Sequence, residues 1–301
     1  MPISAKRIVA LHKALRARSG AYRMLVRVIF LLALGYAMML LLGYLCQSKL
    51  VFMPPRDVSW TPAMAGLAYE DLRLEAAPGQ RINAWFIPGD DARGTLIFAH
   101  GNGENIGWLM DYVEFYRQFR VNVLFFDYRG YGNSAGKPSE NATYEDAAAV
   151  WKYLTETRGV SPSQIVIAGR SLGGAVAAHL ANEVTPAGLI LESSFTCVPD
   201  IGAHYFPWLP VRLIARIHYD TKSIIGSINC PVLIAHSPVD EVIPYSHGRR
   251  LFELAREPKS FVDMSAGHND SPRDKGRDFE KAVDEFLSKC LPETPLHSEP
   301  R

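Results

Sequence analysis

The sequence predicts an α/β domain whose mostly parallel sheet has helices on both faces, with a small helical cap insertion and an N-terminal transmembrane helix. Two observations in the body of the chain lead to this fold class. Short apolar segments alternate with longer helical ones, and the alternation is interrupted once, by about 40 residues. The third observation is a long uncharged apolar run that follows a basic N-terminal tail.

The N-terminal segment has the length and composition of a membrane anchor. Residues 1–27 carry seven basic side chains and no acidic one, so a chain of net charge +1 has 25 basic and 31 acidic residues in its remainder. Residues 28–48 carry no charge, and Val28–Cys46 is almost wholly apolar. At about 1.5 Å per residue this run spans roughly 28 Å, close to the hydrocarbon thickness of a bilayer. We therefore expect a basic tail at 1–27 and a transmembrane anchor at 28–48.

A cleavable secretory signal and a lipoprotein cysteine at Cys46 are the alternatives for this segment. The apolar run is longer than the roughly 7–15 residues of a typical signal, and Leu45 stands where a small residue is expected. The excess of Lys and Arg before the run predicts a single-pass protein with a cytoplasmic N-terminus. Its body would lie on the non-cytoplasmic side, in the periplasm if the source is bacterial, and the basic tail would contact anionic membrane lipid.

The body is expected at 54–290, followed by a flexible tail at 291–301. Two strands joined by a turn at Pro78-Gly79 are predicted at 69–75 and 81–87. Apolar runs typical of buried parallel strands follow at 95–99, 121–126, 164–168, 188–191 and 231–235, with a last strand at 260–264. Helices are expected at 106–119, 143–158, 172–184, 245–257 and 278–290. The interruption, at about 193–229, is aromatic and punctuated by proline, which predicts the cap.

Two segments match the pattern G-x-S-x-G, and their contexts differ. The segment 169–173, centred on Ser171, follows a predicted strand and runs directly into a helix of small residues. This is the context of a nucleophile elbow, in which a sharp turn leaves no room for side chains on either side of the serine. The segment centred on Ser134 is followed by Lys137-Pro138 rather than by a helix. We therefore predict Ser171 as the nucleophile.

A serine nucleophile needs a base and a carboxylate that orients the base, and at such an elbow they follow in the order Ser, Asp or Glu, His. His268 lies just after the last predicted strand, whereas His236 ends a buried strand and is expected in the core. Asp240 follows that same strand and is the predicted acid, with Glu241 and Glu192 as alternatives. These positions predict a Ser-His-Asp triad at the carboxyl edge of the sheet.

An oxyanion intermediate needs two amide donors. The Leu172 N–H lies next to the predicted nucleophile, and the loop at 100–105 after the third strand offers the Asn102 N–H. Aromatic side chains of the cap are candidates for substrate contact: Phe195, Tyr205, Phe206 and Trp208.

These motifs together resemble the α/β-hydrolase superfamily. The segments HGNGENI, FFDYRGYGNSAGKPSE, GRSLGG and SPVDEVIPYSHGRRL…GHND are similar to those of membrane-anchored ABHD13- and ABHD17-type serine hydrolases and of bacterial serine aminopeptidase-like relatives. The resemblance implies an α/β-hydrolase fold over roughly Leu50–Cys290 and the same Ser-His-Asp triad. It also implies that Asp127 and Tyr128 form a structural strand-end motif. A departure is Ser237-Pro238, where relatives usually have glycine.

We therefore expect a membrane-anchored serine hydrolase that cleaves an acyl ester or thioester of a small-molecule or lipid-like substrate through an acyl-enzyme. A serine peptidase of the aminopeptidase type is an alternative, and a non-catalytic membrane-tethered binding protein is a further one. No cofactor, metal or nucleic-acid partner is expected, because G-x-x-x-x-G-K-[ST] and H-E-x-x-H are absent. The cysteines of the body permit one disulfide at most, and free thiols are the simpler expectation.

Overall fold

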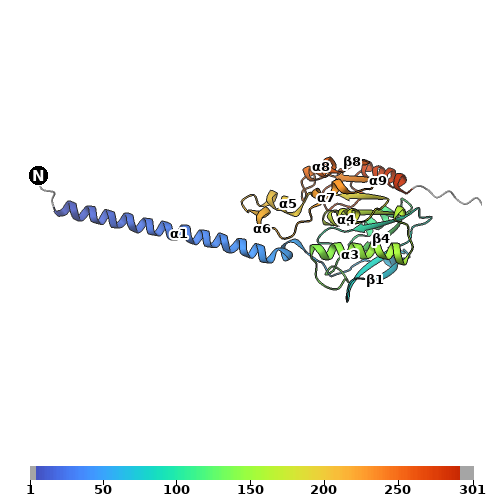
Figure 1. The fold of residues 1–301 in the computed structure, drawn as a ribbon, viewed down its shortest axis with the longest axis horizontal. Coiled ribbons are helices and arrows are strands. Elements are labelled where there is room, and N and C mark those ends of the chain that lie inside the picture. Colours follow the sequence, from blue (N-terminus) through green and yellow to red (C-terminus); the bar gives the residue numbers. More distant parts are fainter. Residues whose placement is uncertain (1–4, 292–301) are drawn as a thin grey trace, which may run out of the picture. The chain divides into compact units, whose positions relative to one another are not determined.

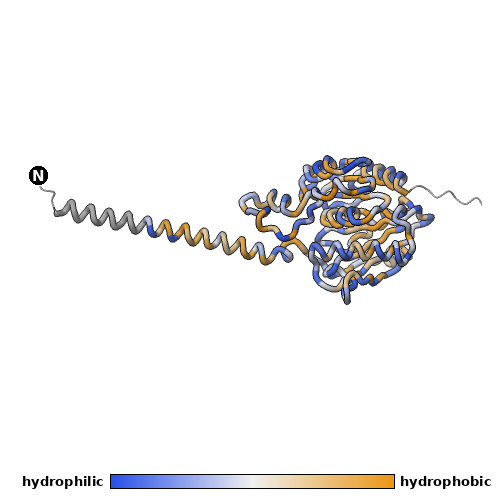
Figure 2. The backbone as a smooth tube through the Cα atoms, viewed as in Figure 1, coloured by the Kyte–Doolittle hydropathy of each residue, from blue (hydrophilic) through white to orange (hydrophobic). Residues whose placement is uncertain are grey.

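The computed structural model describes residues 5–291, with side chains from Tyr22 onward, and divides them into two units between Gln47 and Ser48. Helix α1, Ala5–Val51, makes up the first unit and ends within the second. The most apolar 18-residue stretch of its segment 22–51 has a mean hydropathy of 2.4 and no buried residue, and the segment suffices by length and composition to cross a bilayer. Figure 2 shows this segment as mostly hydrophobic. The predicted anchor at 28–48 lies inside it. The side chains of residues 1–21, most of the predicted basic tail, lie outside the described part.

The second unit is built on one eight-stranded sheet in the order β1-β2-β4-β3-β5-β6-β7-β8 (Figure 1). The strands are β1 (Glu70–Ala77), β2 (Gln80–Ile87), β3 (Thr95–Ala99), β4 (Asn122–Phe126), β5 (Ile165–Arg170), β6 (Gly188–Glu192), β7 (Val232–His236) and β8 (Lys259–Asp263). Strands β1 and β2, and β2 and β4, pair antiparallel, and the other neighbours pair parallel. The predicted mostly parallel sheet is thereby confirmed.

The central strands are mostly apolar, with polar residues at their ends, because both faces of the sheet are covered. Every residue of β3, β5, β6 and β7 is buried, as continuous apolar runs require in a parallel sheet. Helices α3 (Glu140–Lys152), α4 (Leu172–Glu183) and α8 (Tyr245–Leu254) pack with one hydrophobic core. Helices α2 (Met110–Arg117) and α9 (Arg277–Cys290) pack with the other. Helices on both faces were predicted and are present.

The structure refines the ends of two predicted helices. The expected helix at 106–119 begins as a 3-10 turn, Ile106–Trp108, because the Asn105 side chain accepts the Gly107 N–H, and α2 follows it. The expected helix at 143–158 starts earlier, where Ser139 caps α3 through the Ala142 N–H, and it ends in a π-helical turn. Side-chain caps therefore mark the starts of the 3-10 turn and of α3, whereas α2 itself begins without a side-chain cap.

The insertion between β6 and β7 is helical, as expected. It contains α5 (Val198–Tyr205), α6 (Val211–Ile214) and α7 (Thr221–Ile224). Its second part belongs to the body, because Tyr219 and Ile225 are fully buried in the core. The exposed part of the predicted cap is thus concentrated in α5, α6 and the turn between them.

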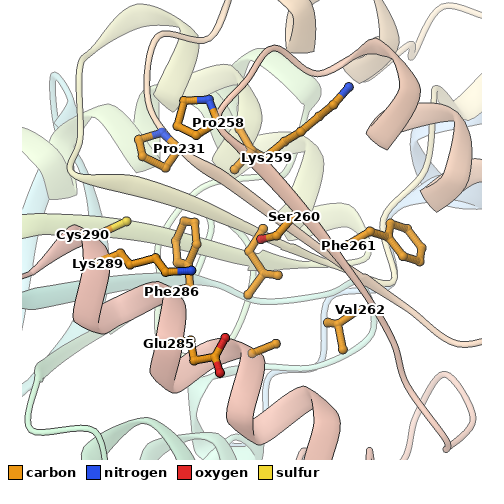
Figure 3. Close-up of a pocket in the computed structure, with 13 residues that line it drawn as sticks. Pro231, Pro258, Lys259, Ser260, Phe261, Val262, Glu285, Phe286, Lys289 and Cys290 are labelled. Atoms are coloured by element: carbon orange, nitrogen blue, oxygen red, sulfur yellow. The ribbon is translucent and has the colours of Figure 1, made fainter.

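A separate hollow lies beside the last two strands of the sheet. A cavity of about 350 Å³ is lined by the start of β7, by β8 and by the end of α9 (Figure 3). No residue predicted for catalysis lines it. Nearby Cys290 is free, like the other three cysteines of the chain. Leu291 is buried at the end of α9, and the rest of the predicted C-terminal tail lies outside the described residues.

Candidate active site

The structure places Ser171 in the turn between β5 and α4. Its backbone has φ 53° and ψ −117°, a conformation that costs free energy for a residue with a side chain and is characteristic of a nucleophile elbow. A Cβ added to Gly169 would lie 2.1 Å from the Gly173 carbonyl oxygen, and one added to Gly173 would lie 2.0 Å from the Ala99 carbonyl oxygen. Both glycines of the motif are therefore required by close backbone contacts.

In the second G-x-S-x-G segment, the serine hydroxyl is used in hydrogen bonds that hold the fold. Ser134 is buried, and its Oγ accepts the Asn83 N–H at 2.8 Å. The same hydroxyl donates to the Asp127 carbonyl oxygen at 2.8 Å. The first bond ties the loop after β4 to β2, the second closes the loop on itself, and together they leave the hydroxyl occupied.

The predicted base and acid are in direct contact. His268 lies in the loop after β8, is buried, and its Nδ1 is 2.8 Å from Asp240 Oδ2. The other carboxylate oxygen of Asp240 accepts the N–H groups of Val242 at 2.9 Å and Ile243 at 2.7 Å. Burial alone would raise the pKa of Asp240, but the hydrogen bonds from His268 and from these amides outweigh it, and the pKa is lowered. Asp240 is therefore held as a carboxylate facing the imidazole.

The alternative acids have other partners. Glu241 Oε2 accepts the main-chain N–H of His268 at 3.0 Å, so it holds the histidine loop rather than the ring. Glu192 is buried at the end of β6, where its carboxylate contacts Lys275 and Tyr112. Since neither carboxylate contacts the imidazole, Asp240 is the acid that the geometry pairs with His268.

His236, expected in the core, is fully buried. Its Nε2 lies 2.9 Å from the Ile243 carbonyl oxygen. Burial lowers its pKa, which favours the neutral ring. His236 therefore holds the loop that carries Asp240 through its contact with the Ile243 carbonyl.

Ser171 and His268 line one pocket of about 410 Å³, together with Leu172 and Asn102. Its wall is largely apolar and comes from three parts of the chain: Val51 and Met53 at and just after the end of α1, Phe195, Val198 and Ile201 in the insertion, and Val242 and Ile243 after β7. Of the proposed cap aromatics, Phe195 lines this pocket. Tyr205, Phe206 and Trp208 do not line it and are exposed.

The Asn102 side chain is fixed by the segment that follows α1. Its Nδ2 donates to the Val51 carbonyl oxygen at 2.6 Å, and its Oδ1 accepts the Met53 N–H at 3.0 Å. Tyr131 donates its hydroxyl to the same Oδ1 at 2.6 Å. These bonds hold the loop so that Asn102 lies at the pocket together with Leu172 at the start of α4.

Two side chains at the end of β4 brace the same loop. Asp127 Oδ1 accepts the Ile106 N–H at 2.9 Å, and the Tyr128 hydroxyl donates to the His100 carbonyl oxygen at 2.8 Å. Burial raises the pKa of Asp127 to about 7. The pair lies behind the pocket, and neither residue lines it.

The sheet order, the elbow after β5 and the acid and histidine after β7 and β8 define the α/β-hydrolase class of protein. Residues 90–222 match the family model described as "Serine aminopeptidase, S33". The chain is 34% identical to the alpha/beta hydrolase domain-containing protein WAV2 of Arabidopsis thaliana, over 82% of this chain and 89% of that protein. It is 33% identical to the uncharacterized membrane protein YNL320W of Saccharomyces cerevisiae, over 76% of this chain and 84% of that protein.

Solved structures show the same fold. The esterase Pf2001 of Pyrococcus furiosus superposes with a TM-score of 0.67 and 23% identity, over 78% of this chain and 98% of that one. The chain belongs to the family of alpha/beta hydrolase domain-containing proteins. The predicted resemblance and fold are confirmed, and a hydrolase activity follows from the family.

Proposed function

We propose that this protein is a membrane-anchored serine hydrolase that cleaves an acyl ester or thioester through a Ser171-His268-Asp240 triad. The observation that carries the proposal is the 2.8 Å contact between His268 Nδ1 and Asp240, with Ser171 in the same largely apolar pocket. A hydroxyl, an imidazole and a buried carboxylate in this order are the groups that acyl transfer requires.

In this mechanism Ser171 Oγ attacks the acyl carbonyl and gives its proton to His268 Nε2. The His268 Nδ1–H donates to Asp240, which orients the ring and stabilises the imidazolium that forms. The proton then passes to the leaving alcohol or thiol, and the acyl group stays on Ser171. Water, deprotonated by the same imidazole, hydrolyses the acyl-enzyme.

The negative oxygen of each tetrahedral intermediate would accept the N–H groups of Leu172 and Asn102. Leu172 opens α4, where the helix dipole also favours negative charge. Asn102 is suited to the second position because its side chain is held by Val51 and Met53, which fixes the direction of its backbone.

The pocket wall favours an acyl chain over a peptide amine. None of the residues that line it, in the described part of the chain, is acidic, so the pocket has no carboxylate to hold a free amino terminus. Asp200, the acidic residue of α5, is bound to Lys222 and Arg212 instead. The family description "serine aminopeptidase" keeps a peptidase as the second candidate.

A lipid-like substrate at the bilayer is favoured by the position of the wall in the sequence. Val51 is the last residue of the apolar helical segment 22–51, Met53 lies two residues after it, and both line the pocket. A body tethered by that segment would present its pocket within a few residues of the membrane surface. The basic side chains before the segment favour a cytoplasmic N-terminus and a body on the other side.

The direct test is a fluorophosphonate probe on the purified full-length chain, followed by p-nitrophenyl esters and acyl thioesters of increasing chain length. We expect labelling and turnover in the wild type and neither in Ser171→Ala. Aminoacyl anilides tested in parallel distinguish the peptidase. Labelling that survives Ser171→Ala and is lost in Ser134→Ala would refute the assignment of the nucleophile.

The topology is tested separately on spheroplasts of a bacterial expression host. External protease should degrade the body without lysis. Protection of the body until lysis would reverse the proposed orientation.

A further inference from the structure

The residue before the predicted nucleophile is a buried arginine whose contacts reach two loops of the site. Arg170 is 5% exposed at the end of β5. Its Nη1 donates to Glu104 Oε2 at 2.8 Å, in the loop that carries Asn102. Its Nη2 donates to the His268 carbonyl oxygen at 2.7 Å and to Asn269 Oδ1 at 2.9 Å.

Glu104 links Arg170 to the backbone of the loop that carries Asn102. Its Oε1 accepts the Gly101 N–H at 2.5 Å, while its Oε2 is bound to Arg170. Burial alone would raise the pKa of Glu104, but Arg170 and the Gly101 amide outweigh it and the pKa is lowered. The carboxylate therefore stays charged, and it fixes the peptide next to Asn102.

A second buried ion pair supports Arg170 from the other side. Glu192 Oε1 lies 3.8 Å from Arg170 Nε and contacts the ammonium of Lys275, which is 1% exposed. The Glu192 carbonyl oxygen accepts the Ser171 N–H at 2.9 Å, so the same residue holds the elbow. Lys275 also closes the histidine loop, because its carbonyl oxygen accepts the Ser265 N–H at 3.1 Å.

Two cations and two carboxylates thus form one cluster, in which Arg170, Lys275 and Glu192 are buried and Glu104 is partly exposed. Burying such charges is costly unless each has partners, and here the charges pair with one another, while Arg170 and Glu104 also bond backbone groups of the site. A charge cluster that only kept itself neutral could lie anywhere in the body. A position that joins the loop of Asn102, the loop of His268 and the elbow points instead to a role in the reaction.

We propose that Arg170 is a positioning residue that sets the oxyanion loop 100–105 and the histidine loop 265–275 relative to Ser171. The inference rests on the proposed hydrolase function. The planar guanidinium is suited to this role because its N–H groups point in fixed directions toward acceptors on both loops. Lysine at the same position could satisfy one loop but could not bridge both.

The test compares Arg170→Gln and Arg170→Lys with Arg129→Gln in the purified full-length chain. Arg129 is a matched control because it is also a buried arginine, 8% exposed and bound to Asp146 at 2.7 Å, and it does not line the pocket. The measurements are kcat and KM on a p-nitrophenyl ester, the fluorophosphonate labelling rate, thermal stability, and hydrogen exchange in the two loops.

We expect Arg170→Gln to lower kcat and the labelling rate by about 10²-fold with little change in KM, because a displacement near 1 Å costs a factor of this size. Hydrogen exchange should rise in both loops, and Arg170→Lys should restore little of the loss. Arg129→Gln should lose thermal stability and keep the kcat of the folded protein. Should Arg170→Gln not fold, Glu104→Gln supplies the test, with faster exchange in 100–105 alone and a smaller loss of kcat.

Unchanged kcat and unchanged exchange in Arg170→Gln would overturn the proposal. An equal loss of kcat in Arg129→Gln would also overturn it, since the effect would then be general destabilisation. Wild-type protein that neither turns over esters nor reacts with the probe would refute the proposed function, and the exchange measurement would still decide whether Arg170 fixes the two loops.

Discussion

Replacing Gly173 by alanine should change the free energy of unfolding through two effects of opposite sign. The sign of the measured change shows which effect is larger. Gly173 lies in the first turn of α4, and a Cβ there would be 2.0 Å from the Ala99 carbonyl oxygen and 2.5 Å from that of His100. For a helical glycine, propensity alone predicts that Gly→Ala stabilises by up to ~1 kcal/mol. The added methyl group, in contrast, must push the start of α4 away from the end of β3.

The magnitudes favour the steric effect. The distance of 2.0 Å is about 1 Å shorter than real Cβ contacts allow, and both neighbours are backbone atoms that cannot rotate away. Overpacking of this kind typically costs about 1–3 kcal/mol, and a rigid neighbour indicates the upper part of that range. After subtracting the gain in helix propensity, we expect Gly173→Ala to lower the free energy of unfolding by about 2 kcal/mol. For a body of this size that is a fall in Tm of roughly 4–8 °C.

The same displacement should reduce activity, because the loop of Asn102 begins where the clash occurs. We expect the fluorophosphonate labelling rate of Gly173→Ala to fall by about 10²-fold. Gly202→Ala in α5 is the control, because its Cβ would meet the side chain of Val211, at 2.7 Å from Cγ1, rather than backbone. A Gly173→Ala variant with wild-type or higher Tm and an unchanged labelling rate would refute this reasoning.

Three further predictions concern the acid, the second serine and the buried strand-end carboxyl. Asp240→Asn should lower kcat by about 10⁴-fold with the fold intact, because an amide favours the wrong tautomer of His268; a loss below tenfold in steady-state kinetics would contradict the triad. Ser134→Ala leaves the Asn83 N–H and a carbonyl unpaired, so denaturant unfolding should show a loss of about 1–3 kcal/mol while kcat of the folded protein is kept. Because the pKa of Asp127 is raised to about 7 in the folded protein, its protonated carboxyl contributes stability that is fully present below about pH 4. This contribution is lost as the pH rises through about 7. Asp127→Asn should flatten this fall in unfolding free energy, and an identical pH profile in the variant would contradict it.

The sequence predicted the fold well where the signal is local. Runs such as 95–99 are buried strands because nothing polar interrupts them, and the elbow at Ser171 was identified because a strand, a glycine-flanked serine and a helix are contiguous. The order of acid and histidine along the chain also predicted that Asp240 and His268 would be partners, and in the structure the two side chains are in contact.

What the sequence did not predict depends on contacts between distant segments. Arg170 and Glu104 are 66 positions apart, and Lys275 meets Glu192 across 83. No periodicity marks such charges as buried, although an arginine inside the elbow motif was a signal to look for a partner. The proposed cap aromatics illustrate the converse, because composition cannot tell Phe195, which lines the pocket, from Trp208, which is exposed.

The hydrogen bonds that join Asn102 to the Val51 carbonyl and the Met53 N–H also bear on where the folded body begins. The prolines at 54 and 55 suggest a natural place to cut, but a chain that starts there lacks the two acceptor and donor groups that hold this loop. It also lacks Phe52, whose ring is 3% exposed and packs edge-on to Tyr219. A truncated protein for crystallisation should therefore start at or before Ser48, since Val51 and Met53 are already part of the wall of the pocket that contains Ser171 and His268.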